Sequence, residues 1–398
     1  MKLSLLALAA AGFAAALPTT LNEGYSEECP NGLAIRPEWS QMSKKHRKEY
    51  ISALQCMINK PSTVNETQIN SHYEDFWYTH QFPGPAIHFV AAFLPWHRHY
   101  VYTYHQSLKE CGYTGEMPFW AWDWNADDVF KSSIFDPDSE SGLGTNGTTP
   151  EGAPISEYFS AGSNVSLTYT DGFAVTDGGL ANHQIEYPYK HSFQRNFNLN
   201  PPGTPVSLDT FIKESEVTKA LAYDRYDYFH KYVEGAPPQE IAKGVPEIEG
   251  MKGFAGMHGA VHRLIGGDMA SIIDHKAPDW CPSFESDESS NYGANASPND
   301  PLFFVHHSNI DRIWAKWQDQ DPENNKFAYG GFTFHNYTTE EGTGVASIND
   351  TLEFGFITDP VPVHYTMDYQ KTYCYKYADK DYREEDNLVD FLAQGFSW

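Results

Sequence analysis

Histidines occur in two widely separated groups whose spacing suits a bound metal ion. His258 and His262 stand four residues apart, so on a helix both imidazoles face the same side. The adjacent pair His306 and His307 follows further along the chain. Neighbouring helical residues point about 100° apart, so only one of the pair can face the same metal, and spacing leaves open which. A lone His-x-x-x-His is also found by chance on polar helix faces, so the context decides.

A second group precedes and enters the aromatic run FVAAFLPWHRHYVYTY, residues 89–104. His97 lies one turn into a helix predicted to start at Pro95, and His88 stands just before the run. His80 ends the preceding predicted helix, and a Pro/Gly loop allows the chain to fold back. His99 points nearly opposite to His97 and is expected not to be a ligand. Three more histidines have no such partners and are expected to be solvated: His46, His72 and His105.

The composition of the two groups narrows the choice of metal. Gly259 stands where a zinc protease of the HExxH type needs its glutamate, so that class is excluded. Two three-histidine sites without a carboxylate or thiolate ligand suit copper and leave positions open for oxygen and a substrate. The alternative is a structural glycoprotein whose histidines bind nothing, which leaves both groups unexplained.

The elements that position these histidines are predicted to be helical. Apolar periodicity and capping signals predict helices over residues 40–58, 65–79, 95–109, 208–232, 256–265 and 301–318. Residues 136–205 are rich in Gly, Ser, Asn and Pro and predict long loops with a few short strands, and residues 351–377 suggest further strands. We therefore expect a mainly α fold, a four-helix bundle around a binuclear site with long loops and a few short β-strands.

Charge and the N-terminal residues limit the partners and the location. The chain has 398 residues and a formal net charge of −26, which disfavours nucleic acid and anionic membranes as partners. Residues 1–17 are predicted to be a secretory signal peptide, residues 18–378 one catalytic domain and residues 379–398 a short C-terminal tail. The mature protein is expected to be secreted.

Sequons and cysteines agree with secretion. Five sequons are candidate glycosylation sites: Asn65, Asn146, Asn164, Asn336 and Asn349. Asn295 is disfavoured because Pro298 follows its acceptor serine. Five cysteines in an oxidising compartment predict two disulfides and one remaining thiol. Cys56 and Cys111, near the ends of two predicted helices, are the preferred pair, and the others cannot be paired.

At this point the motifs resemble the type 3 copper family of tyrosinases, catechol oxidases (polyphenol oxidases) and haemocyanins, most of all the short secreted fungal members. IHFVAAFLPWHRHY resembles the signature of its first copper site (CuA), and HGAVH with NDPLFFVHHSNIDRIW that of its second (CuB). PFWAWDW and Tyr375-Lys376-Tyr377 resemble two further motifs of the family. The resemblance implies CuA ligands His80, His88 and His97, and CuB ligands His258, His262 and His307, with His306 beside them. It further implies that Phe93 and Phe303 pack on ligand imidazoles and that Asp311 fixes the CuB helix, with Arg36 as a distant partner.

Five positions bear on the reaction that the resemblance implies. Ala86 replaces a cysteine that forms a thioether with the second CuA histidine in many relatives. Gly259 replaces an Asn that, with a glutamate here matched by Glu249, positions a proton-accepting water in strong monophenol hydroxylases. Ala294 is the expected gate over CuA, and Arg263 is placed to attract a substrate carboxylate.

The resemblance therefore implies two copper ions per chain and oxidation of o-diphenols to o-quinones, with O2 reduced to water. Because Gly259 cannot hold the water as Asn would, catechol oxidase activity with weak monophenolase activity is expected. The alternatives are a true tyrosinase and, less favoured, a haemocyanin-like oxygen-binding protein. Small phenols and O2 are the expected partners, with no nucleic acid or membrane, and the protein is expected to be a monomer or weak homo-oligomer.

Overall fold

The computed structural model describes most of the chain apart from its ends and several loops. The described residues are 29–64, 69–81, 83–148, 156–159, 166–169, 172–186, 191–201, 204, 206–235, 255–270, 297–336 and 341–384. The predicted signal peptide, residues 1–17, lies outside them. No helix among the described residues is long and apolar enough to cross a membrane.

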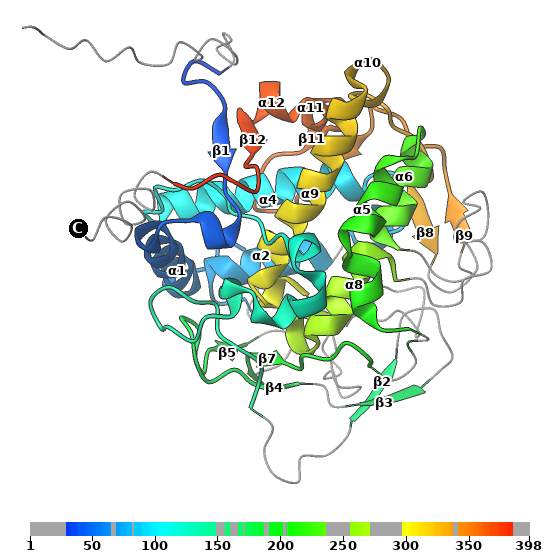
Figure 1. Ribbon diagram of the computed structural model, residues 1–398. Helices are drawn as coiled ribbons and strands as arrows, with labels where there is room; N and C mark the ends of the chain where they lie inside the picture. Colours follow the sequence, from blue (N-terminus) through cyan, green and yellow to red (C-terminus); the bar gives the residue numbers. More distant parts are fainter. Residues whose placement is uncertain are drawn as a thin grey trace, which may run out of the picture.

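Helices form the centre of the molecule (Figure 1). The α-helices are α1 (Lys44–Asn59), α2 (His72–Gln81), α3 (Gly84–Ile87), α4 (Phe93–Glu110), α5 (Glu214–Leu221), α6 (Tyr226–Glu234), α8 (Gly256–Ile265), α9 (Leu302–Gln320), α10 (Pro322–Asn325), α11 (Val363–Met367) and α12 (Tyr369–Thr372). Short 3-10 helices are η1 (Trp39–Gln41), η2 (Trp122–Trp124), η3 (Ala126–Lys131), η4 (Ser133–Phe135), η5 (Leu208–Ile212), η6 (Gly267–Ala270) and η8 (Ser297–Asn299).

The strands are short and form only two-stranded pairs among the described residues. Strand β1 (Ala34–Arg36) pairs in parallel with β12 (Tyr375–Tyr377), so the two ends of the described chain lie side by side (Figure 1). The antiparallel pairs are β2 (Ser156–Phe159) with β3 (Ser166–Tyr169), β4 (Phe173–Ala174) with β7 (Gln194–Arg195), β5 (Gln184–Ile185) with β6 (His191–Ser192), β8 (Phe334–Asn336) with β9 (Glu341–Thr343), and β10 (Thr351–Leu352) with β11 (Val361–Pro362).

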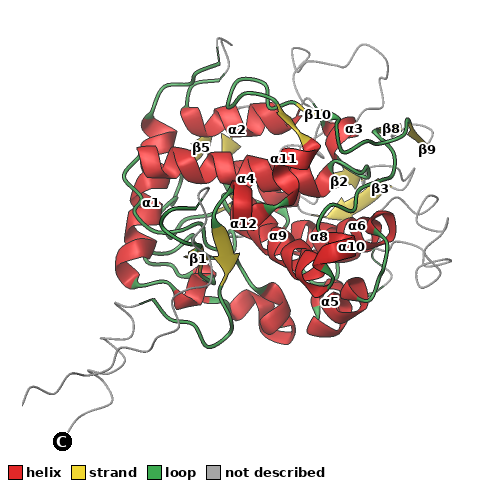
Figure 2. Cartoon of the chain, turned by 90° about the horizontal axis from the view of Figure 1, so that it is seen from above, coloured by secondary structure: helices red, strands yellow, loops and turns green. Residues whose placement is uncertain are grey.

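The four helices α2, α4, α8 and α9 carry the histidines of both groups except His88, which directly follows α3. Helix α4 packs directly on α9, and α8 packs on α6 and on α9. Seen from above, α4 and α9 cross in the middle of the molecule (Figure 2). Nearly every residue of α9 is buried, including polar ones, and this places its histidines away from solvent. The predicted mainly helical fold is therefore confirmed.

Several predicted boundaries differ from the structure. Helix α1 begins at Lys44 and not at residue 40, and it is capped by Ser43, whose side chain accepts the His46 N–H. Helix α4 begins at Phe93, so Pro95 lies inside its first turn. The predicted helix over residues 208–232 is divided into η5, α5 and α6. The Trp317 indole N–H donates to the Tyr223 carbonyl at 2.7 Å, so a tertiary partner replaces helical bonding at one of these breaks.

The disulfide expected between Cys56 and Cys111 is present, and it joins the ends of α1 and α4. A second disulfide joins Cys29 to Cys374 and fastens the N-terminal segment beside β12. The remaining cysteine, Cys281, lies outside the described residues.

The expectation that three lone histidines are solvated is wrong for two of them. His72 is buried, with Nδ1 2.9 Å from an Asp75 oxygen and Nε2 3.0 Å from the Ser107 hydroxyl. His105 is buried with Nε2 3.1 Å from the Gly115 carbonyl. Asp75 lies three residues after His72 on the same helix, whereas Ser107 and Gly115 come from another helix and a turn, which spacing within one helix does not reveal.

Candidate metal centre

The structure brings the predicted histidines into two compact groups. His80 from the last turn of α2, His88 just after α3, and His97 on α4 form one group. The other group comes from α8 and α9 and holds four side chains, His258, His262, His306 and His307. Within each group one nitrogen per histidine lies within 4.8 Å of the others. The two groups adjoin, because the His97 and His307 rings stack with centroids 4.4 Å apart and planes inclined by 15°.

Backbone carbonyls orient four of these imidazoles. In each case Nδ1 lies within hydrogen-bonding distance of a carbonyl oxygen: His88 with Gly84 (3.2 Å), His97 with Phe93 (2.7 Å), His258 with Glu234 (3.2 Å) and His262 with Met269 (2.7 Å). A carbonyl can only accept, so Nδ1 carries the proton and Nε2 presents a lone pair. This is the tautomer that a metal-binding histidine adopts when its second nitrogen is held by the protein.

The second group contains a contact that calls for a cation. The Nε2 atoms of His258 and His262 lie 3.0 Å apart, although both rings donate through Nδ1 to carbonyls. Two lone pairs therefore face each other at hydrogen-bond distance without a proton between them. A metal ion bound by both nitrogens removes this repulsion, so the residues present fit such an ion.

Burial keeps these imidazoles neutral. It lowers the pKa of His88 to about 3 and that of His262 to about 4. For His97, His258 and His307 burial, followed by neighbouring imidazoles, lowers the pKa well below the ordinary value. Neutral imidazole is the form that binds metal, so at neutral pH these donors need not lose a proton first.

The adjacent histidines of α9 have different surroundings. The Trp122 indole N–H donates to Nδ1 of His306 at 3.1 Å, so a neutral His306 carries its own proton on Nε2. His307 is buried and has no hydrogen-bond partner for either ring nitrogen among the described residues. Of these two histidines, His307 is therefore the one in which neither ring nitrogen has a protein partner among the described residues.

Two phenyl rings hold the imidazoles in place from both sides. Phe303 stacks on His307 with ring centroids 4.0 Å apart. Phe93 lies 4.8 Å from the His97 ring and 4.8 Å from the His258 ring, so it touches both groups. Both side chains are fully buried, which excludes water from this side of the centre.

The remaining predicted positions are partly described. Gly259 and Arg263 are half-buried on α8, and among the described residues a Cβ added to Gly259 would meet only the Glu234 carbonyl oxygen, at 3.7 Å. Ala86 lies in α3 and is half-buried. Glu249 and Ala294 lie outside the described residues.

Of the glycosylation candidates, Asn146 and Asn349 are exposed. The other three cannot be placed: Asn65 and Asn164 lie outside the described residues, and so does the side chain of Asn336.

Two site residues escape sequence reasoning. Trp122 belongs to the aromatic run of residues 118–124, whose composition predicts burial but not a bond to His306. Glu234 accepts from the backbone next to His88 and from the ring of His258, and no motif marks it.

Two adjoining groups of buried imidazoles on helices define a binuclear histidine metal centre. Residues 70–320 match the family model of the common central domain of tyrosinase. The chain therefore belongs to the tyrosinase family, and its cofactor is the binuclear type 3 copper centre of that family.

Similar proteins span nearly the same length of chain. A tyrosinase-like protein of Diaporthe leptostromiformis is 28% identical over 366 residues, covering 86% of this chain and 77% of that protein. The N-acetyl-6-hydroxytryptophan oxidase of Emericella nidulans is 26% identical over 393 residues, covering 91% and 98%. The solved structure of a polyphenol oxidase from Thermothelomyces thermophila has a TM-score of 0.67 at 24% identity, covering 87% and 89%, and shares the fold.

Proposed function

We propose that this copper oxidase converts o-diphenols to o-quinones, with weak monophenol hydroxylation at most. Two diphenols each lose two electrons and two protons, and one O2 takes them up to give two waters. The observation that carries the proposal is Gly259, which presents no hydrogen-bonding side chain beside His258. Without such a group, a water that accepts the phenol proton is held less firmly, and hydroxylation of monophenols suffers most.

We propose His80, His88 and His97 as ligands of one copper and His258, His262 and His307 as ligands of the other. Their support is the convergence of nitrogens within each group and the Nδ1 bonds that leave Nε2 lone pairs inward. His306 is excluded as a ligand because the Trp122 indole N–H occupies its Nδ1 and leaves the proton on Nε2.

When bound, copper supplies the electron transfer between the diphenol and O2. The protein supplies position and dryness. Phe93 and Phe303 fix ligand rings and close the buried side. By the family resemblance, we propose that Glu249 holds the water that accepts the phenol proton, that Arg263 attracts a substrate carboxylate and that Ala294 is the gate residue; Glu249 and Ala294 lie outside the described residues.

A substitution at Gly259 tests this reading directly. Space for a side chain exists, since the nearest atom to an added Cβ is 3.7 Å away. Gly259→Asn should raise the ratio of monophenolase to diphenolase activity several-fold, measured with tyramine and 4-methylcatechol. Gly259→Ala is the matched control, because it adds the Cβ without the amide and should leave the ratio unchanged. An unchanged ratio in the Asn variant would refute the role of residue 259.

The ligand set is tested by counting copper. His307→Gln should lower the copper content from about two to about one per chain, whereas His306→Gln should leave about two. Equal losses in both variants would show that both rings hold metal. A loss of about one copper in His306→Gln, with about two retained in His307→Gln, would show that His306 is the ligand.

A true tyrosinase remains the second candidate, and rapid hydroxylation of tyramine without a lag by the unaltered enzyme would favour it. A haemocyanin-like oxygen carrier is less favoured, and it requires reversible O2 binding without turnover of catechol. We also propose that residues 18–378 form one catalytic domain of a secreted glycoprotein. The two disulfides, which persist in oxidising compartments, support secretion.

A further inference from the structure

Glu234, the last residue of α6, contacts both histidine groups. Its carboxylate Oε1 accepts the Phe89 N–H at 2.6 Å, and Phe89 directly follows His88. Its backbone carbonyl accepts the Nδ1–H of His258 at 3.2 Å. The residue is only 1% exposed, so these bonds are not exchanged for bonds to solvent. One residue therefore fixes the orientation of a histidine in each group.

The backbone at Phe89 needs such a bond. Its φ is +59°, in the left-handed region that residues with a Cβ rarely adopt. This turn directs the His88 ring towards His97, with centroids 5.3 Å apart, and sends Val90 into the core. A strained conformation persists only where its surroundings enforce it, and the Glu234 carboxylate does so here.

Close backbone packing fixes the other contact. Gly235, with φ +83°, lies so near the start of α8 that an added Cβ would be 2.1 Å from the Ala255 oxygen. An added Cβ at Gly256, with φ +61°, would be 2.2 Å from the Gly235 nitrogen. The end of α6 is therefore pressed onto the start of α8, which holds the Glu234 carbonyl against His258.

The second carboxylate oxygen faces a buried histidine. The Nδ1 atom of His230, one turn earlier on α6, lies 3.8 Å from Oε2 of Glu234, and both side chains are at most 1% exposed. The Glu234 carboxylate therefore lies between the Phe89 N–H and the His230 ring.

We infer that Glu234 is a positioning residue shared by the two copper sites. Its carboxylate sets the path of the chain after His88, and its carbonyl sets the ring of His258. The inference rests on the proposed ligand roles of these two histidines. It predicts that loss of the carboxylate weakens copper binding without removing any ligand.

Three variants test it by copper retention, measured as copper per chain after dialysis against graded chelator. Glu234→Ala removes the acceptor and should weaken copper retention about 10- to 100-fold, the effect typical of lost partners of metal ligands. Glu234→Gln keeps an oxygen acceptor for the Phe89 N–H and should stay within a few-fold of the unaltered protein. Glu38→Ala is the matched control, because Glu38 is a buried carboxylate that accepts the Ser40 N–H outside both histidine groups.

Thermal unfolding of the copper-free proteins shows whether a variant loses copper because histidines are displaced or because the whole protein is less stable. The control should unfold at a lower temperature and still retain copper like the unaltered protein. Equal copper loss in Glu38→Ala and Glu234→Ala would overturn the inference, as would normal retention in Glu234→Ala. If Glu234→Ala does not fold, Glu234→Asp, which keeps the carboxyl group but shortens its reach, carries the same test. Failure of the unaltered protein to bind two coppers would instead refute the ligand assignment.

Discussion

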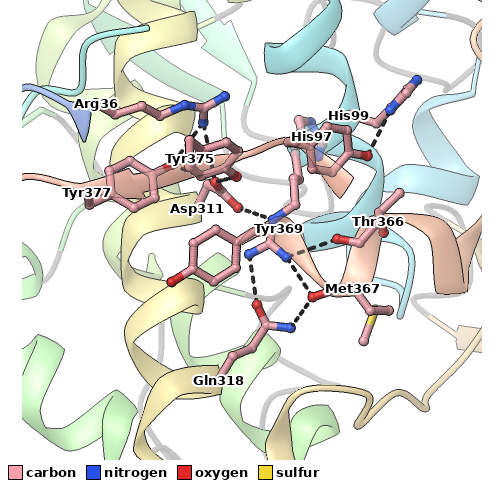
Figure 3. Close-up of polar contacts among 12 residues, drawn as sticks. Arg36, His97, His99, Asp311, Gln318, Thr366, Met367, Tyr369, Tyr375 and Tyr377 are labelled. Atoms are coloured by element: carbon pink, nitrogen blue, oxygen red, sulfur yellow. Dashed lines mark hydrogen bonds and ion pairs between the residues drawn. The ribbon is translucent and has the colours of Figure 1, made fainter. Parts of the chain in front are cut away.

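Replacing Asp311 should destabilise the protein more than any exposed substitution on the same helix. Asp311 is 3% exposed and lies in a buried cluster of polar side chains (Figure 3). It accepts from Arg98 Nε at 2.5 Å and from the Tyr377 hydroxyl at 2.5 Å, and also from the Tyr375 hydroxyl. Arg36 Nη1 lies 3.5 Å away, as expected from its predicted pairing. One carboxylate thus compensates two arginines that are each 1% exposed.

This cluster also ties together the helices that carry both histidine groups. Arg98 directly follows His97 on α4, and Asp311 lies one turn after His307 on α9. Arg98 further donates to the Thr366 carbonyl at 3.0 Å, and its guanidinium stacks over the Trp314 ring at 3.6 Å. Loss of the Arg98–Asp311 bond should therefore loosen the contact between α4 and α9 near the centre.

The size of the effect follows from leaving buried charges unpaired. Removing one partner of a buried ion pair costs about 3–5 kcal/mol. With about 2.1 cal/mol/K of unfolding entropy per residue, this lowers the Tm of a chain this long by about 5 °C. The assay is urea and thermal unfolding of copper-free Asp311→Ala. Gln320→Ala, at an exposed position on α9, is the control and should cost about 1 kcal/mol or less. Equal losses in the two variants would refute the reasoning.

Three further changes should have measurable effects. Burial lowers the pKa of His230 to about 3 in the folded protein. This histidine therefore does not lower the free energy of unfolding above pH 6.5. Between pH 6.5 and 3 it lowers that free energy, because the unfolded chain takes up a proton and the folded protein does not. Between pH 6.5 and 5 the free energy of unfolding of His230→Phe should fall by about 2 kcal/mol less than that of the unaltered protein. The same dependence on pH in both proteins, measured by urea unfolding, would contradict this. Opening the Cys56–Cys111 disulfide with paired alanines releases a 55-residue separation and should cost about 4 kcal/mol, measured by urea unfolding. Copper at 100 times its Kd should stabilise the protein by about 2.7 kcal/mol for each site that it fills, and equal Tm values with and without copper would contradict preferential binding to the folded protein.

Much of the candidate site could be predicted because its histidines form local sequence patterns. The four-residue spacing of His258 and His262 works only on a helix, and α8 covers residues 256–265 as expected. Spacing does not show which histidine of the 306–307 pair is hydrogen-bonded to another side chain. That depends on Trp122, which lies far away in the sequence and donates to His306. The break near Tyr223 likewise depends on a tertiary bond from Trp317. Local spacing predicts ligands and helices, whereas partners from distant elements decide tautomers and helix ends.

Glu234 and Asp311 show why a site of this kind needs a rigid frame. Nε2 lone pairs held 3.0 Å apart repel each other, so the His258 and His262 rings would turn apart if their Nδ1 atoms were free. The carbonyl bonds from Glu234 and Met269 prevent that rotation. Close packing of Gly235 and Gly256 holds the Glu234 carbonyl in place, and the buried Arg98–Asp311 pair separately joins α4 to α9. Copper binding therefore need not supply free energy to order the site. A site that is already ordered can hold the metal and still leave positions open for a substrate.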